Sequence, residues 1–310
     1  MGIYTWGQLR MQLEQSVPGV TLDKIDASLT TRYARVLDHT RWSWLEQTAY
    51  VETQAPYQST TDTVNVTQGS NAIVGTGTTW SSGLNGLKFN VEANGPLYTF
   101  TFVDATHATL DRVYEGSSNT AAAYSLLQNI YPLPSDFKRC LDVSSADDGE
   151  PLDDLSELEM DQSVGFRNVI GTPEVYAITP SSEALDGGTS WQIEFFPVPR
   201  LAKGYPVRYE RSGNAFNGSN TGSAPLPFVS DGVLLAGGKA DLWGELAAQR
   251  ESAALAEIAK GYEAKFGDEL TTMVRANLRQ SAATSLKPAK RYTRHRLARL
   301  VRNSFPRIRG

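Results

Sequence analysis

Apolar side chains recur every three or four residues in the first part of the chain. Between Thr5 and Val17 this spacing predicts a helix whose N-cap is Thr5, and Pro18-Gly19 ends it. A second helix is predicted to begin near Thr21 or Leu22 and to run as far as the Arg-Trp-Ser-Trp-Leu segment at 41–45. The apolar positions of the two helices are Trp6, Leu9, Leu13 and Val17, then Leu22, Ile25, Leu29, Tyr33, Val36 and Leu37. Residues 48–54 alternate and predict a strand.

From Thr61 to Leu127 the period changes to two. Short runs rich in Val, Thr, Phe and Tyr alternate with polar residues and are separated by Gly, Asn and Ser, a pattern that is typical of antiparallel strands joined by tight turns. Six strands in about 65 residues predict a small β-barrel or sandwich. The strands are placed around Val64 and Val66, Ile73 and Val74, Leu87 to Val91, Tyr98 to Phe102, Leu110 to Tyr114, and Tyr124 to Leu126.

A second β region follows this block. Residues 137–143 predict a strand or a short turn of helix, and three further runs at 171–179, 191–201 and 205–212 predict strands. The expected inward side chains are Tyr176, Ile193, Phe195, Val207 and Tyr209. Residues 212–223, rich in Gly, Asn and Ser, predict a flexible loop.

The last third of the chain predicts helices again. Residues 228–259 are rich in Ala and other strong helix formers, Tyr262 and Phe266 extend the apolar stripe, and a further helix is predicted from Asp268 to about Ser281. The fold class is therefore α+β: a helical bundle from the N- and C-terminal segments, a β domain, an inserted small β-barrel or sandwich, and an extended basic C-terminal tail. The predicted boundaries are 1–60, 61–129, 130–227, 228–286 and 287–310.

Composition changes this picture at the C-terminus. The net charge is −5, but no Asp or Glu follows Glu269, and the last 41 residues hold 11 Lys and Arg. The first 269 residues carry 18 basic against 34 acidic side chains, a net charge of −16. An acidic body with a basic tail predicts a polyanionic or acidic partner for the tail. No apolar run approaches the roughly 18 residues that span a bilayer, and no secretory signal is expected at the N-terminus.

Catalytic chemistry finds little support in the sequence. The three histidines, His39, His107 and His295, fall in a predicted helix, a turn and the tail, and the single cysteine, Cys140, excludes a multi-thiolate metal site. The acidic patch from Asp147 to Asp161 has eight acids in fifteen residues. It lacks the spacing of a calcium loop, so a solvated loop that leads into an acidic helix is favoured over a cation site. We therefore expect no enzyme, no metal and no cofactor.

The basic tail from Lys287 to Gly310 interleaves arginines with apolar residues. Docking of an amphipathic segment into an acidic groove of a protein, phosphate contacts with nucleic acid, and a disordered solvated tail all remain open, and protein docking is favoured. The residues that this docking would use are Arg291, Arg294, Arg296, Leu297, Arg299, Leu300, Val301, Arg302 and Phe305. Separately, Trp42, Trp44, Trp243 and Tyr262 are predicted to be anchors in a core or an interface.

Three features in this order resemble the head-to-tail adaptor proteins of tailed bacteriophages. They are the helical N-terminus that ends in Trp42-Ser43-Trp44, the middle block, and the Ala-rich helix with Tyr262 near its end. The middle block consists of Tyr-Pro-Leu-Pro-Ser-Asp-Phe at 131–137, Gly-Thr-Pro-Glu-Val-Tyr at 171–176, Ile-Glu-Phe-Phe-Pro-Val-Pro at 193–199 and Tyr-Pro-Val-Arg-Tyr at 205–209. The resemblance covers residues 1–60 and 130–280, and the block at 61–127 looks like an insertion.

The resemblance implies a virion protein that is made in the host bacterial cytoplasm and forms a ring, commonly of twelve copies, beneath the portal. Its partners would be the portal protein, the next tail component and further copies of the chain, and genomic DNA would pass through the channel without sequence-specific binding. No membrane partner is implied. Two other functions stay open: a tail accessory protein that binds carbohydrate or a receptor through the inserted β block, and a nucleic-acid-binding protein that acts through the tail.

Overall fold

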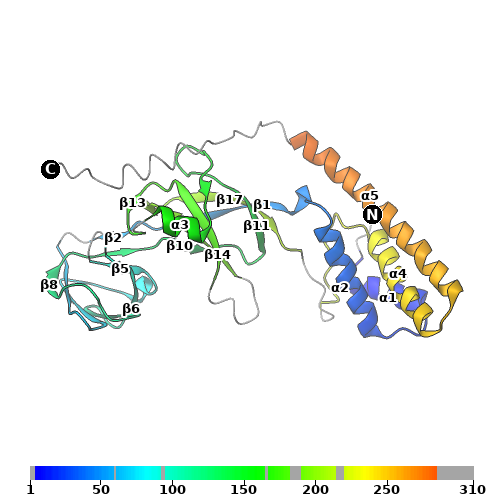
Figure 1. The fold of residues 1–310 in the computed structure, drawn as a ribbon, viewed down its shortest axis with the longest axis horizontal. Coiled ribbons are helices and arrows are strands. Elements are labelled where there is room, and N and C mark those ends of the chain that lie inside the picture. The colour runs from blue at the N-terminus through cyan, green and yellow to red at the C-terminus, as the bar shows by residue number, and fades with distance from the viewer. Residues whose placement is uncertain are drawn as a thin grey trace. The chain divides into compact units, whose positions relative to one another are not determined.

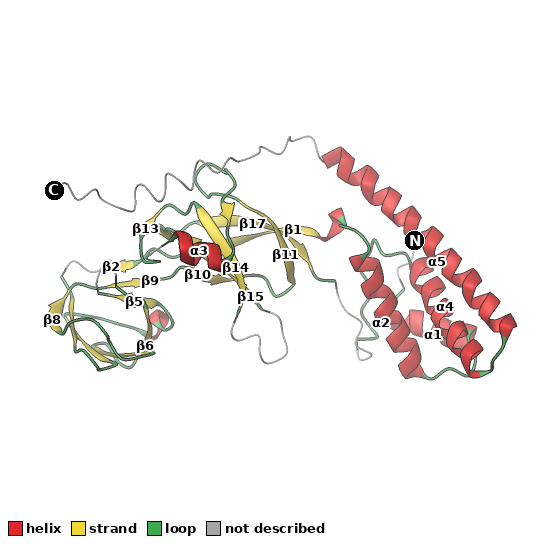
Figure 2. Cartoon of the chain, in the orientation of Figure 1, coloured by secondary structure: helices red, strands yellow, loops and turns green. Residues whose placement is uncertain are grey.

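The structure is a computed structural model, and it describes residues 4–58, 61–91, 95–164, 167–181, 190–213 and 220–284. It confirms the predicted mixed α+β class. The chain divides into two compact units, and the described residues of each are 4–46 with 211–284 and 47–210. We call them the helical unit and the strand unit. Figure 2 shows that helices dominate the first and strands the second.

The helical unit draws on both parts of the chain that flank the strand unit, as the blue and the yellow-to-orange helices of Figure 1 show. Its elements are α1 (Trp6–Ser16), α2 (Leu22–Asp38), the short 3-10 helix η1 (Ser43–Leu45), α4 (Asp231–Gln249) and α5 (Ala253–Thr284). Helix α4 contacts α1, α2 and α5. One hydrophobic core joins all four long helices, so segments almost the whole chain apart in sequence are held by the same buried side chains.

The spacing of apolar residues explains how the first helices pack. Trp6, Leu9 and Leu13 of α1 are fully buried, and the predicted N-cap at Thr5 is confirmed because its hydroxyl accepts a hydrogen bond from the Gln8 amide. The Gln8 side chain in turn accepts one from the Thr5 amide, which completes a capping box. Buried residues of α2 repeat at the same spacing. Both helices therefore present one apolar face to the shared core.

Two predicted helix boundaries were wrong. Helix α2 ends at Asp38 and does not continue to Leu45, because Trp42 takes an extended conformation and η1 follows. At the other end of the chain, one helix, α5, runs from Ala253 to Thr284, so no separate helix begins at Asp268. The break lies earlier, at Glu251, whose φ of 49° ends α4 among residues that favour helix.

The block at 61–127 forms most of one eight-stranded sheet, which curls into an open half-barrel (Figure 2). The strand order is β2-β9-β5-β6-β7-β4-β3-β8, so β2 and β8 end the sheet. The strands are β2 (Tyr57–Gln58), β3 (Thr63–Val66), β4 (Ala72–Thr76), β5 (Lys88–Asn90), β6 (Tyr98–Phe102), β7 (His107–Leu110), β8 (Asn119–Ala122) and β9 (Ser125–Leu127), with the 3-10 helix η2 (Ser82–Leu84). Alternate residues fill its core, which contains Val64, Phe89 and Phe100.

The strand count of this block was predicted too low. The predicted fifth strand is displaced, since β7 begins at His107 and Val113-Tyr114 lies outside any strand. Strand β8 was missed because its sequence, Asn-Thr-Ala-Ala, has little β propensity and only Ala122 is buried. The pairing of β3 with β8 supplies what the local sequence lacks.

The remaining described residues of the strand unit form three smaller sheets. They have the orders β1-β17-β11, β10-β15-β14-β12 and β13-β16. Their strands are β1 (Glu46–Glu52), β10 (Ile130–Pro132), β11 (Phe137–Val143), β12 (Asp153–Asp154), β13 (Ile170–Gly171), β14 (Val175–Pro180), β15 (Trp191–Phe196), β16 (Val198–Pro199) and β17 (Gly204–Arg211). All five predicted inward side chains, Tyr176, Ile193, Phe195, Val207 and Tyr209, are buried in one core.

The acidic patch leads into a short helix, as predicted. Helix α3 (Glu157–Ser163) begins with a capping box in which the Ser156 hydroxyl accepts from the Glu159 amide and the Glu159 carboxylate accepts from Ser156. Acidic side chains at 157 and 159 lie in its first turn, where the helix dipole favours them. The charge run therefore has a local structural role.

Candidate functional site

The predicted docking segment lies outside the described residues. Residues 285–310 include all nine of its members: Arg291, Arg294, Arg296, Leu297, Arg299, Leu300, Val301, Arg302 and Phe305. Their role stays a prediction. The structure does place the four aromatic anchors, all of them in the helical unit.

Trp42 and Trp44 belong to one aromatic stack. Trp42 is fully buried, and its indole N–H donates to the Val36 carbonyl at 2.9 Å, which caps the end of α2. The rings of Trp42 and Trp44 stack with centroids 5.6 Å apart, and Phe228 stacks on Trp44 at 4.8 Å. Trp44 also donates to the Gln280 side chain on α5. The stack thus joins three parts of the chain: the segment after α2, the segment before α4, and α5 itself.

The other two anchors lie on α4 and α5. Trp243 is half-buried against the shared core. Tyr262 is half-buried too, and the Lys239 ammonium lies 5.5 Å from the centroid of its ring, within the range of a cation–π contact. All four side chains contribute to packing inside the helical unit, whereas their predicted use at an interface with another chain stays a prediction.

A charged network crosses the same unit and was not predicted. The Arg32 side chain is only 8% exposed, its Nε donates to Asp241 Oδ2 at 2.9 Å, and its Nη2 lies 2.7 Å from Glu263 Oε2. The ring of Phe266 lies beneath its guanidinium at 4.8 Å. Burial alone would lower the pKa of Arg32, but the hydrogen bonds to the two carboxylates raise it overall. The arginine stays charged and ties α2 to α4 and α5.

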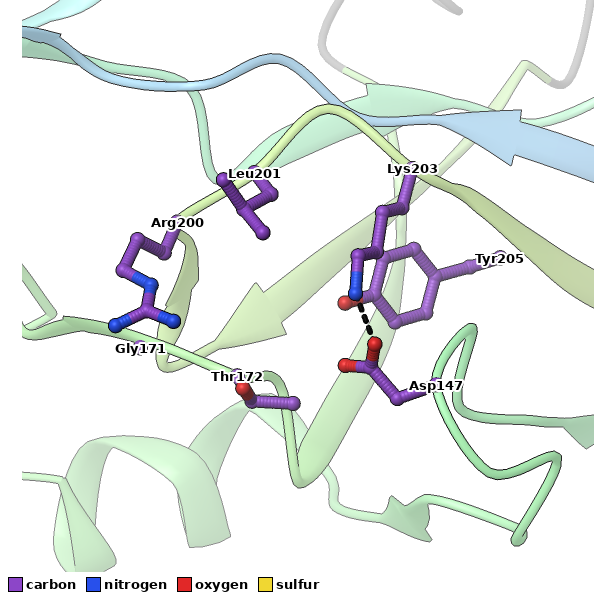
Figure 3. Close-up of a pocket in the computed structure, with 7 residues that line it drawn as sticks. All are labelled: Asp147, Gly171, Thr172, Arg200, Leu201, Lys203 and Tyr205. Atoms are coloured by element: carbon purple, nitrogen blue, oxygen red, sulfur yellow. Dashed lines mark hydrogen bonds and ion pairs between the residues drawn. The ribbon is translucent and has the colours of Figure 1, made fainter.

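The strand unit holds a polar pocket of about 110 Å³ (Figure 3). It lies where β13 and β16 end. These two strands pair in parallel, Gly171 opposite Pro199, and the Arg200 amide donates to the Gly171 carbonyl at 3.0 Å. Because parallel strands end at the same edge, Thr172 and Arg200 leave the pair side by side. The lining residues are Asp147, Gly171, Thr172, Arg200, Leu201, Lys203 and Tyr205.

A buried threonine fixes the turn that forms one wall of the pocket. Thr53, 3% exposed, has its hydroxyl 3.0 Å from the Leu201 carbonyl oxygen and 3.1 Å from that of Lys203. The same hydroxyl accepts from the Lys203 amide at 3.1 Å, and the Thr53 amide donates to the Lys203 carbonyl. The turn therefore holds its shape without a helix or strand of its own.

Lys203 and Asp147 form an ion pair at one side of the pocket, and Tyr205 lies beside them (Figure 3). Burial, together with the Asp147 carboxylate, raises the pKa of Tyr205 to about 12, so its hydroxyl keeps its proton at neutral pH. Nothing in the sequence marked this pocket, since its residues come from three separate stretches of the chain, at 147, at 171–172 and at 200–205. The one local signal is Pro199-Arg200-Leu201, where charged and apolar residues follow a strand end.

The described part of the chain contains neither a cluster of metal ligands nor a helix that could span a membrane. There, no three His, Cys, Asp or Glu side chains lie close enough to hold a metal ion. None of the helices among those residues has the length and apolar character to cross a membrane.

The fold defines a mixed α+β protein in which the two segments that flank the strand unit in the sequence share one helical core. The family model described as SU10 adaptor protein matches residues 88–289, which is 202 of the 310 residues. The chain belongs to this family of phage head-to-tail adaptors, and it is a structural component of the virion. A search of the curated proteins found no match.

The range of the match differs from the range of the resemblance seen in the sequence. It begins at residue 88, inside the half-barrel, and it continues past α5. The strands from β5 onward therefore lie within the matched range, whereas α1, α2 and the first half of the half-barrel precede it. Family membership implies contacts with other head and tail components of the phage.

Proposed function

We propose that the protein forms a ring between the portal and the tail and lines the channel through which DNA leaves the head. The observation that carries this proposal is the match to the adaptor family, which spans 202 of the 310 residues. The helical unit supports it, because a core that joins both flanking segments gives a rigid body on which contacts between copies can be built. Twelve copies are expected from the family resemblance.

The charge distribution suits both a channel for DNA and docking to the portal. The first 269 residues carry a net charge of −16, and an acidic channel wall repels DNA and lets it slide. The basic tail from Lys287 to Gly310 would dock into clefts of the portal, with Leu297, Leu300, Val301 and Phe305 as apolar anchors and the arginines as charged contacts. The nozzle, the tail tube or the fibres would then bind the other side of the ring.

Imaging of the purified protein, alone and mixed with portal rings, tests the assembly. A ring that caps the portal is expected, and a protein that stays monomeric with portal present contradicts the proposal. Deletion of residues 287–310 should abolish portal binding and leave the unfolding midpoint unchanged. Equal binding by the shortened and the full chain would exclude tail docking.

Two substitution sets separate protein docking from nucleic-acid binding by the tail. In one, Leu297, Leu300, Val301 and Phe305 become Ser. In the other, Arg294, Arg296, Arg299 and Arg302 become Gln. Portal docking requires both the apolar and the charged positions, so both sets should weaken portal binding. DNA binding through phosphates requires only the arginines and falls steeply with salt. If the Ser substitutions leave the DNA affinity unchanged and the Gln substitutions abolish it, the tail binds nucleic acid.

The inserted half-barrel would face the outside of the ring, where an insertion leaves ring closure undisturbed. The carbohydrate-binding alternative needs exposed aromatic rings at one edge of this domain. Among its described residues, the aromatic side chains are buried or half-buried, and six of them share its core: Trp80, Phe89, Tyr98, Phe100, Tyr114 and Tyr124. We therefore favour a contact with neighbouring subunits or tail parts over a sugar site.

A further inference from the structure

The pocket of the strand unit contains more hydrogen-bond donors than the chain itself uses. The Arg200 guanidinium and the Thr172 hydroxyl, both exposed, have no side-chain partner among the described residues. Among the same described residues, the Tyr205 hydroxyl has none either, and the Lys203 ammonium is paired only with Asp147. Figure 3 shows these groups arranged around the hollow, with Arg200 on one side and Lys203 with Tyr205 on the other. The donors converge on a space of about 110 Å³.

Arg200 is unusual within its own unit. Residues 47–210 contain eight Lys and Arg, and the other seven each have at least one hydrogen bond, ion pair, ring contact or electrostatic contact. Arg200 alone has none through its side chain among the described residues. Its planar guanidinium offers two parallel donors, which suit a carboxylate.

The surroundings restrict which anion fits. Residues 47–210 carry 8 basic against 21 acidic side chains, a net charge of −13, and Asp147 itself lines the pocket. A polyanion such as DNA would bring many phosphates against this acidic surface, which costs electrostatic free energy. A single carboxylate brings only one charge. Beside Arg200, Leu201 is 50% exposed and offers an apolar contact of the kind that a peptide uses.

We propose that this pocket binds one Asp or Glu side chain of another protein chain, with Arg200 as the bidentate donor and the Thr172 and Tyr205 hydroxyls as further donors. Leu201 packs against an apolar residue next to that acid. The site is a docking point for an acidic-apolar segment of a neighbouring chain in the particle. It is separate from the basic tail and does not depend on ring closure.

The test uses the full chain labelled with ¹⁵N at Gly and Thr, with the amide signals of Gly171 and Thr172 as the local readout. The probe is the peptide acetyl-Ala-Leu-Glu-Ala-amide, and the same peptide with Gln in place of Glu is its control. The Glu peptide should shift both signals in a saturable way. The Gln peptide should bind at least about tenfold more weakly, the factor expected when a charge-assisted hydrogen-bond pair is lost.

Two variants with the same charge change complete the design. Arg200→Gln should weaken the Glu peptide by at least about tenfold, while Lys260→Gln on α5, whose partner is Glu257 on the helix surface, should leave the affinity unchanged. Arg200 has no side-chain hydrogen bond or ion pair to lose among the described residues, so the unliganded spectrum of its variant should keep the wild-type pattern. Equal binding of both peptides, or full affinity in Arg200→Gln, would overturn the proposal. It is overturned too if inorganic phosphate or a DNA duplex shifts these signals at a lower concentration than the Glu peptide.

Discussion

Among the described residues of the helical unit, Arg32 is the most deeply buried charge, and its two carboxylate partners lie on different helices. Replacing it with alanine leaves Asp241 without its cation, leaves Glu263 with only the exposed Arg35, and opens a space above Phe266. We expect Arg32→Ala to lower the free energy of unfolding by about 2–4 kcal/mol, because one partner of a buried pair is removed. Urea unfolding followed by tryptophan fluorescence measures this loss.

Arg35 provides the matched control for this prediction. It contacts the same Glu263, at 3.1 Å, and the same Phe266 ring, at 5.2 Å, but its side chain is 56% exposed. An exposed ion pair contributes less than about 1 kcal/mol, so Arg35→Ala should cost far less than Arg32→Ala. If the two losses are equal, burial is not what makes the Arg32 network strong.

Asp104 gives a prediction on pH dependence. Its carboxylate accepts from the Thr106 and His107 amides at 2.8 Å each, in the turn between β6 and β7. The hydrogen bond from the Thr106 amide is the largest cause, and together with His107 it lowers the pKa of Asp104 to about 2 from an ordinary 3.8. Because the pKa of Asp104 is lowered in the folded state, the charged Asp104 stabilises the fold above pH 3.8, and this stabilisation is lost as pH falls toward 2.

NMR titration of the Asp104 carboxyl carbon checks this directly, and a midpoint near 3.8 contradicts it. Asp104→Asn keeps an oxygen that accepts hydrogen bonds from the Thr106 and His107 amides, so these two amides should stay protected from hydrogen exchange. Asp104→Ala removes the acceptor, and both amides should exchange faster. Equal exchange in the two variants would show that the turn does not depend on this acceptor.

At the scale of elements, the sequence predicts what periodicity encodes and misses what tertiary contacts impose. The faces of α1 and α2 follow from apolar spacing, and the inward residues of β14, β15 and β17 follow from alternation. The end of α2 does not, because it depends on Asn277 of α5, whose side chain accepts from the Ser43 amide and donates to the Arg41 carbonyl. That contact spans more than 230 residues, so no local pattern contains it.

The break between α4 and α5 also depends on a contact between elements. Arg250 and Glu251 favour helix locally, yet the chain turns at Glu251 so that α5 can pack back along α4, the most extensive contact between the described elements. A faint local signal exists, since Ser252 has the residue type of an N-cap and its hydroxyl accepts from the Leu255 amide at 3.5 Å. The pocket was missed for a related reason: its donors meet only after β13 and β16 pair.

Glycines in α4 and α5 yield a prediction about helix packing. A Cβ at Gly237 of α4 would lie 2.8 Å from Arg32 Cδ and 2.9 Å from Phe266 Cδ2, so Gly237→Ala should destabilise the unit by about 1–3 kcal/mol through overpacking. A Cβ at Gly261 of α5 meets nothing within 4 Å. There the same substitution should stabilise by about 0.5–1 kcal/mol, because alanine favours helix over glycine.

Thermal unfolding of the two variants tests whether their unfolding midpoints shift in opposite directions. Gly237→Ala should lower the midpoint and Gly261→Ala should raise it. A lowered midpoint in Gly261→Ala would contradict the prediction. If instead Gly237→Ala is neutral, then Arg32 and Phe266 can move aside, and the close approach of α2, α4 and α5 is not a requirement of the fold.

At the scale of the whole molecule, each unit has hydrophobic cores of its own. Among the described residues, the core of the helical unit draws on residues 6–45 and 226–274, and the three cores of the strand unit lie within residues 49–209. The strand unit begins in β1 and ends in β17, which are neighbours in one sheet. Near one end of this pair, the Thr53 amide is bonded to the Lys203 carbonyl. A chain that leaves the helical unit at residue 46 therefore returns at residue 211 along an adjacent strand.

This arrangement predicts that the helical unit survives removal of the strand unit. A chain in which a short Gly-Ser linker replaces residues 47–210 should keep its helical circular dichroism and unfold in one cooperative transition, because its core is intact and the closure of a short linker costs little. Four of the six tryptophans, Trp6, Trp42, Trp44 and Trp243, report on that transition. Gly237→Ala should lower its midpoint in the shortened chain as in the full one. A gradual, non-cooperative transition would mean that the helical core needs the strand unit to fold.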